Sequence, residues 1–87
     1  MYLHNAQQFW NLDNYRSVFF DMGPMSGEVE VELINTDGEK ESFTLCISTR
    51  SNVDIAETIK LEFMEALDQG RGVFDLDQYF DRFEDER

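Results

Sequence analysis

Within residues 28–34 of this 87-residue chain, acidic and apolar residues alternate strictly from position 28 to position 33. The acidic positions are Glu28, Glu30 and Glu32, and the apolar positions between them are Val29, Val31 and Leu33. Because successive side chains of a β-strand point to opposite faces, this period of two predicts a half-buried strand. Its buried face would be aliphatic, and its exposed face would carry a row of three carboxylates.

A second alternating segment, residues 41–49, predicts the partner strand of a β-hairpin. Its apolar residues are Phe43, Leu45 and Ile47, and the residues between them are Ser42, Thr44 and Cys46. The apolar faces match if residues 36–38 form a three-residue loop, which pairs Val31 with Phe43 and Val29 with Leu45. This loop also puts Asn35 at the first position of a type I turn and Gly38 in the left-handed bulge position, where each is preferred.

Capping residues and helical spacing predict three helices outside the hairpin. Asn5 would cap a short first helix over residues 5–14 that carries Phe9, Trp10 and Leu12. Ser51 and Asp54 have the capping-box spacing and would open a second helix that ends near Gly70. Its core stripe would be Asn52, Ile55, Ala56, Ile59, Phe63, Ala66 and Leu67. Asp75 would cap the last helix, with Gln78 three residues on and an apolar stripe of Leu76, Tyr79, Phe80 and Phe83.

Residues 15–21, rich in aromatic and β-branched side chains, predict one more strand before the hairpin. The elements then follow in the order α-β-β-β-α-α. The predicted fold is a single α+β domain over residues 1–87, in which a three-stranded antiparallel sheet has helices packed on one face. Its length leaves room for one core only, and its 41% hydrophobic residues are enough to form one.

The net charge narrows the class of partner. Nineteen Asp and Glu residues against seven Lys and Arg give a formal charge of −12, far more than solubility needs. We therefore expect no direct contact with nucleic acid or membranes, and a basic protein surface as the partner. One cysteine, no signal-peptide pattern and no apolar run near the ~18 residues of a membrane span indicate a cytoplasmic protein.

Catalytic side chains are scarce, so we expect a binding protein that is not an enzyme and needs no cofactor. The single histidine, His4, would lie in a loose terminal segment, and a general base must be held within reach of its proton. Cys46 has no basic neighbour in sequence that would lower its pKa. Asp75, Asp77 and Asp81 lack the spacing of a calcium loop, and their helical spacing favours a solvated helix face over a metal site.

The candidate partner-binding residues are carboxylates without basic neighbours. In the predicted register the three glutamates face Ser42, Thr44 and Cys46, so nothing neutralises the row. The full candidate set is Glu28, Glu30, Glu32, Asp37, Asp75, Asp77 and Asp81. A further group lies opposite the core stripe of the long helix and either contacts the last helix or faces a partner: Glu57, Leu61, Met64 and Asp68.

With this order of elements, an Asp37-Gly38 hairpin turn and an acidic-aromatic segment 75–81, the chain resembles the small acidic phage anti-CRISPR proteins. Members of that family inhibit an RNA-guided DNA nuclease by mimicking DNA. The resemblance implies that Asp37, Asp75 and Asp77 contact the basic pocket that reads the PAM. Lys40 departs from the family, which carries an acid on that side of the turn.

The predicted function is a DNA mimic that occupies the basic nucleic-acid-binding groove of a host defence protein, first of all a CRISPR effector nuclease. A groove that accepts phosphates concentrates Lys and Arg, and fixed carboxylates can take the place of the phosphates. The alternative is a small acidic regulatory subunit or antitoxin that neutralises a basic protein without competing with nucleic acid. An enzyme or an ion-binding module is the third and least supported possibility.

Overall fold

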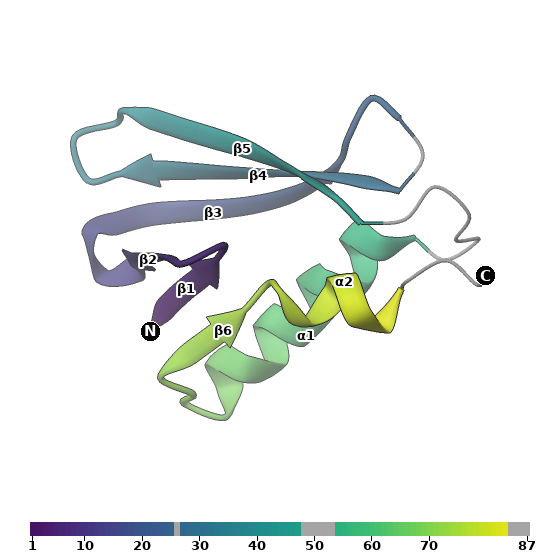
Figure 1. The fold of residues 1–87 in the computed structure, drawn as a ribbon. Coiled ribbons are helices and arrows are strands. Elements are labelled where there is room, and N and C mark those ends of the chain that lie inside the picture. The colour runs from purple at the N-terminus through teal and green to yellow at the C-terminus, as the bar shows by residue number, and fades with distance from the viewer. Residues whose placement is uncertain (26, 48–53, 84–87) are drawn as a thin grey trace.

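The computed structural model describes residues 1–25, 27–47 and 54–83, which form two three-stranded sheets and two α-helices (Figure 1). In chain order the elements are β1 (Tyr2–Asn5), β2 (Gln8–Asn11), the 3-10 helix η1 (Leu12–Asn14), β3 (Tyr15–Met22), β4 (Glu28–Asn35), β5 (Lys40–Cys46), α1 (Ile55–Asp68), β6 (Val73–Asp75) and α2 (Gln78–Arg82). The mixed α+β content is as predicted, but the order α-β-β-β-α-α and the single sheet are wrong.

The first sheet is the predicted antiparallel meander, with strand order β3-β4-β5. Val31 pairs with Phe43 and Val29 with Leu45, which confirms the predicted register. Gly38 lies in the left-handed region with φ of 90°, and its N–H donates to the Asn35 carbonyl at 3.0 Å, as the three-residue loop requires. The part of the predicted strand beyond Ile47 lies outside the described residues.

The second sheet, in the order β2-β1-β6, replaces the helix predicted over residues 5–14. Asn5 pairs with Gln8 across a two-residue turn in which Ala6 and Gln7 both have positive φ, 49° and 72°. This is the backbone of a hairpin turn whose twist matches the flanking strands. Asn5 therefore ends a strand and caps no helix.

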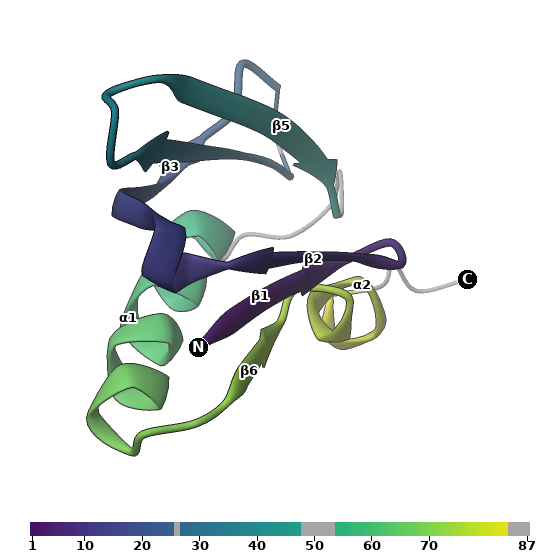
Figure 2. The same cartoon turned by 90° about the vertical axis from the view of Figure 1, so that its left-hand side faces the viewer.

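Parallel pairing of β1 with β6 joins strands about seventy residues apart in sequence, with Leu3 opposite Phe74 and His4 opposite Asp75. Figure 2 shows this sheet below the β3-β4-β5 sheet, with α1 along one side and α2 on the other. Trp10 of β2 stacks on Phe43 of β5 at 4.8 Å between ring centroids, which fastens the N-terminal hairpin to the first sheet.

The core lies between the two sheets and the helices. Val29, Val31 and Leu33 of β4 are at most 1% exposed, and Leu3 of β1 is fully buried. Edge-to-face aromatic contacts then cross the core from β3 to α1 and β6. Phe63 contacts both Phe20 and Phe74 at 5.2 Å between centroids. Large aromatic side chains thus supply much of the apolar area that a chain this short can bury.

Helix α1 begins after Asp54, whose carboxylate accepts the Glu57 N–H at 3.0 Å. The predicted cap Ser51 and the predicted core residue Asn52 lie outside the described residues. Four residues of the predicted stripe are buried and Phe63 is half-buried, but Leu67 is 53% exposed and is not a core residue. The buried members are Ile55, Ala56, Ile59 and Ala66.

Helix α2 begins after Asp77, so Asp75 is not its cap as predicted but the last residue of β6. The helix is fastened to α1 through Glu62, whose carboxylate accepts the Tyr79 hydroxyl at 2.7 Å and Arg82 Nη2 at 2.8 Å. Tyr79 is fully buried, which raises its pKa, and the hydrogen bond to Glu62 raises it further. Neither described helix is long and apolar enough to cross a membrane.

The left-handed backbone at Gly38 gives the first prediction. An L-side chain in this region costs about 1–2 kcal/mol, although the added Cβ of Gly38→Ala would meet only Arg16 Nη2 at 3.7 Å. Gly72→Ala is the matched control, since its backbone is not left-handed and its Cβ would meet nothing within 4 Å. Urea denaturation should show a loss of stability for Gly38→Ala only. Equal midpoints for the two variants would contradict the assigned turn.

The Glu62 contacts give a second prediction, on pH. The Arg82 guanidinium and the Tyr79 hydroxyl hold the pKa of Glu62 below its usual value near 4.5. A lowered folded-state pKa stabilises the fold above the unfolded-state pKa, and this contribution disappears as the pH falls through the folded-state pKa. Wild type should therefore exceed Glu62→Gln in stability by about 1 kcal/mol near neutral pH, a modest figure because the ion pair is part-exposed.

Urea denaturation of both proteins from about pH 7 to about pH 3.5 measures this difference. The gap between wild type and Glu62→Gln should narrow as the pH falls below about 4.5. A gap that stays constant over this range would mean that the Glu62 charge contributes nothing to the attachment of α2.

Candidate functional site: an acidic sheet face

Four carboxylates lie together on the outer face of the β3-β4-β5 sheet, and we call Asp21, Glu28, Glu30 and Glu32 the acidic face. The predicted cross-strand partners on β5 are confirmed as Cys46, Thr44 and Ser42. On the other side, Asp21 of β3 is directly opposite Glu30. No member of the acidic face forms an ion pair within the described ranges 1–25, 27–47 and 54–83.

The pair Asp21 and Glu30 concentrates like charge. Residues directly opposite in an antiparallel pair have Cβ atoms about 4.5–5.5 Å apart, where like charges repel. Asp21 is exposed, while the three glutamates are partly exposed. The fold thus holds two carboxylates close together at a cost in stability. Sequence reasoning missed Asp21 because it predicted a strand over residues 15–21 without assigning that strand a register.

Glu28 also contacts the only thiol of the chain. The Cys46 thiol donates to Glu28 Oε2 at 3.6 Å. Desolvation raises the pKa of the Cys46 thiol, and the Glu28 carboxylate raises it further. Little thiolate is therefore present at neutral pH, which disfavours Cys46 as a nucleophile. This part of the acidic face is suited to binding a positively charged group.

The other predicted acids lie apart from the acidic face. Asp37 is exposed in the turn between β4 and β5, where its N–H donates to Asn35 Oδ1 at 2.9 Å. Asp75 is the last residue of β6 in the second sheet, Asp77 directly precedes α2, and Asp81 is exposed on α2. The structure therefore brings the three glutamates together and Asp75 next to Asp77, but it does not bring all seven predicted residues into one surface.

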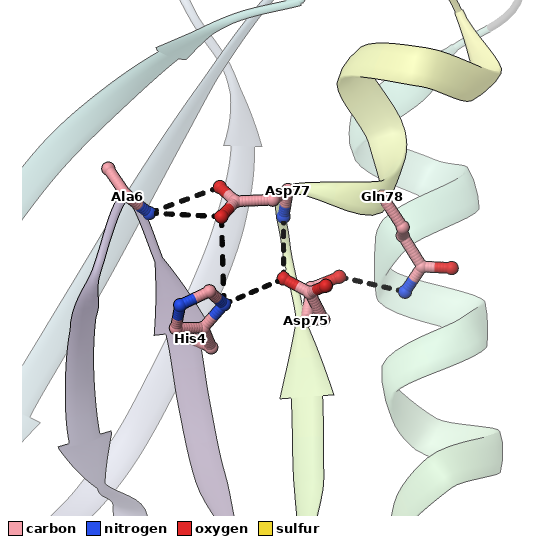
Figure 3. A network of polar contacts seen from close by, with 5 residues as sticks. All are labelled: His4, Ala6, Asp75, Asp77 and Gln78. Carbon is pink, nitrogen blue, oxygen red and sulfur yellow. Dashed lines mark hydrogen bonds and ion pairs between the residues drawn. The ribbon is translucent and has the colours of Figure 1, made fainter.

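Asp75 and Asp77 hold the N-terminal hairpin through a polar network (Figure 3). His4 Nδ1 donates to Asp75 Oδ1 at 2.9 Å and lies 3.6 Å from Asp77 Oδ2. The Asp77 carboxylate also accepts the Ala6 N–H, at 3.1 Å. His4 is thus fixed in β1, only 22% of its side chain is exposed, and the expectation of a loose terminal segment is wrong.

Within the network, both carboxylates already accept hydrogen bonds from other groups of the chain. Asp75 Oδ1 also accepts the Asp77 N–H at 3.0 Å, and Gln78 Nε2 donates to the Asp75 carbonyl at 2.8 Å. One ligand atom from each of His4, Asp75 and Asp77 lies within 4.8 Å of the others, a spacing that a metal ion could use. Both carboxylates already accept backbone N–H groups, so the arrangement is explained by its role in joining β1, β6 and α2.

The second predicted surface, on α1, faces away from the last helix. Leu61 is 55% exposed and Met64 is 60% exposed, while α2 contacts α1 through Glu62. Of the two alternatives for residues 57, 61, 64 and 68, contact with the last helix is therefore wrong. Glu57 forms an exposed ion pair with Lys60 at 3.6 Å. These side chains remain available to a partner.

The network predicts unequal roles for two acids of the candidate set. Asp75→Ala leaves the Asp77 N–H and His4 without their acceptor and should cost about 1–2 kcal/mol. Asp81→Ala removes the same charge from an exposed position and should change stability by less than about 0.5 kcal/mol. Urea denaturation compares the two variants. If they unfold at the same midpoint, the network does not stabilise the contact between β1, β6 and α2.

Comparison of the chain with models of protein families, with curated proteins and with solved structures finds no match. The resemblance to anti-CRISPR proteins stays a prediction, because these comparisons neither support nor contradict it.

Proposed function

We propose that this protein is an acidic DNA mimic that binds the basic nucleic-acid-binding groove of another protein and blocks DNA recognition. The observation that supports this proposal is the acidic face. Its four carboxylates lie beside the stretch of β4 from Glu28 to Glu32, which is about 13 Å long. Divided over this length, they give one charge per ~3–4 Å. A single strand of DNA presents one phosphate charge per ~3.4 Å of helix axis. The acidic face thus offers a groove a similar charge density.

Rigid placement is the second support. The three glutamates belong to the central strand of the sheet, which pairs on both sides, so their backbone is fixed by two ladders. A basic groove gains from a backbone that is already in position, since binding then has to order only the glutamate side chains. The net charge of −12 would also steer the protein toward a cationic surface and raise the association rate.

The first target to test is a CRISPR effector nuclease, which the family resemblance implies. The observed order of elements differs from the family's α-β-β-β-α-α, so the remaining basis is the Asp37 hairpin turn together with Asp75 and Asp77. Of these, Asp37 is exposed and free to contact a partner, whereas the other two are engaged with His4 and Ala6. The acidic face is therefore the stronger candidate for the contact surface.

One observation favours the alternative of a regulatory subunit or antitoxin. Leu61 and Met64 expose apolar area on α1. Mimicry of phosphates requires charge and does not require this apolar area. Such area is typical of contacts between proteins that bury side chains. A partner that used α1 alone could be neutralised without any competition with nucleic acid.

Competition with DNA separates the two functions. With the labelled protein bound to its captured partner, double-stranded DNA carrying the partner's recognition sequence should displace it from a single shared site. Binding should also weaken as salt rises, because exposed charges are screened within about 8–10 Å at physiological ionic strength. Simultaneous binding of DNA and protein, with neither affinity changed, would exclude DNA mimicry and favour the regulatory subunit.

A matched pair of charge reversals locates the contact. Glu30→Lys should weaken partner binding about tenfold or more, and its folded state should be no less stable because the new lysine faces Asp21. Glu65→Lys makes the same change in net charge at an exposed α1 position outside the acidic face and should have little effect. Titration of the partner with each variant measures both affinities. Equal losses would show that only net charge matters.

A further inference from the structure

A groove of about 300 Å³ runs between the first sheet and α1. On one side it is lined by four consecutive residues of β3, 18–21, and on the other by Lys60, Phe63, Met64 and Leu67 of α1. Consecutive side chains of a strand point to opposite faces. A groove that touches four of them in a row must therefore follow the edge of β3.

The edge of β3 is open for pairing. In the strand order β3-β4-β5, β3 is an outermost strand, and among the described strands it pairs only with β4. The Gly23 N–H donates to the Glu28 carbonyl, which shows that residues 23 and 28 stand at a hydrogen-bonding position of the β3–β4 ladder. Because such pairs alternate along an antiparallel ladder, the backbone groups of Val18 and Phe20 point away from β4, toward the groove. Within the described part of the chain, no other hydrogen bond satisfies them.

Most of the groove lining is apolar, and Asp21 and Lys60 are its two charged members. Phe19 is 46% exposed, Met64 60% and Leu67 53%. The opposite edge of the same sheet, β5, instead exposes Lys40, Ser42 and Thr44. Edge strands are normally protected by charges, bulges or covering segments. Between Ser17 and Met22 the β3 ladder has no bulge, so the apolar edge is ready to accept another strand.

We propose that this groove binds an extended segment of a partner protein, which adds to the sheet as a strand beside β3 and alternates apolar with basic residues. The apolar side chains would enter the groove against Phe63 and Met64. The side chains between them would lie on the outer face of the sheet, next to Asp21 and its neighbour Glu30. These carboxylates form no ion pair in the described residues, so lysine or arginine is the complement they need.

A second copy of the chain fits the groove poorly. Joining two β3 edges would bring together two chains of −12 each and place Asp21 of one copy near the acidic face of the other. A basic segment gains from the same charges. This inference goes beyond the proposed function, because strand addition at β3 can occur whether or not DNA competes for the acidic face.

Synthetic peptides test the proposal on the intact protein. The probe is a seven-residue peptide with blocked ends that alternates four lysines with three valines. One control has the same composition with all lysines before all valines, and another carries a methyl group on every backbone amide nitrogen. Calorimetry should show one saturable site for the alternating peptide, with binding at least about tenfold weaker for each control.

Two protein variants locate the site. Met64→Glu places a charge in the groove at an exposed position, and it should weaken binding of the alternating peptide about tenfold or more. Leu61→Glu makes the same charge change on the same helix, at a similarly exposed residue that does not line the groove, and should bind as wild type. Backbone amide NMR signals of Val18 and Phe20 should shift on binding, since those groups would form the new ladder.

Each other outcome contradicts the proposal. Absence of saturable binding up to about 1 mM, or equal binding of the alternating and block peptides, would leave only non-specific attraction between charges. Equal affinities of Met64→Glu and Leu61→Glu would place the peptide elsewhere. A dimer in analytical ultracentrifugation that Met64→Glu abolishes and Leu61→Glu does not would make a second copy the occupant.

Discussion

The pleat of β4 is the constraint on which the rest of the structure depends. Its inward side chains, Val29, Val31 and Leu33, are almost completely buried, and this fixes its three glutamates on the outer face. A slip of one residue would bury three carboxylates and expose three aliphatic side chains, at a cost larger than the stability of most small domains. The acidic face is therefore a direct consequence of the core and cannot be lost while the sheet persists.

Local signals made the β4–β5 hairpin predictable, and their absence made the N-terminal hairpin unpredictable. The first has a strict period of two and an Asp37-Gly38 turn, so register and turn both follow from neighbouring residues. The turn at Ala6 and Gln7 has positive φ at both positions without the glycine or asparagine that normally marks it. Moreover, β1 is stabilised by β6, about seventy residues away, and no local pattern reports such a pairing.

The same distinction explains the candidate site. The glutamate row and its partners on β5 follow from one hairpin, and the prediction of both was correct. Asp21 joins them only through the β3–β4 register, which the sequence left undetermined. Asp75 and Asp77 were predicted to contact a partner, yet they accept hydrogen bonds from His4 and Ala6 because β6 lies beside β1. Long-range pairing thus decides which acids are available.

Strand β3 belongs to both candidate surfaces, and this links them physically. Its edge lines the groove, and Asp21, one of the four lining residues of β3, also stands opposite Glu30 on the outer face. Long-range attraction to the acidic face would speed the approach of a basic partner, while apolar burial against α1 would slow its departure. Phosphate mimicry alone would supply only the first effect. A partner that combined a cationic surface with an extended apolar segment would use both, and β3 is where the two contacts would meet.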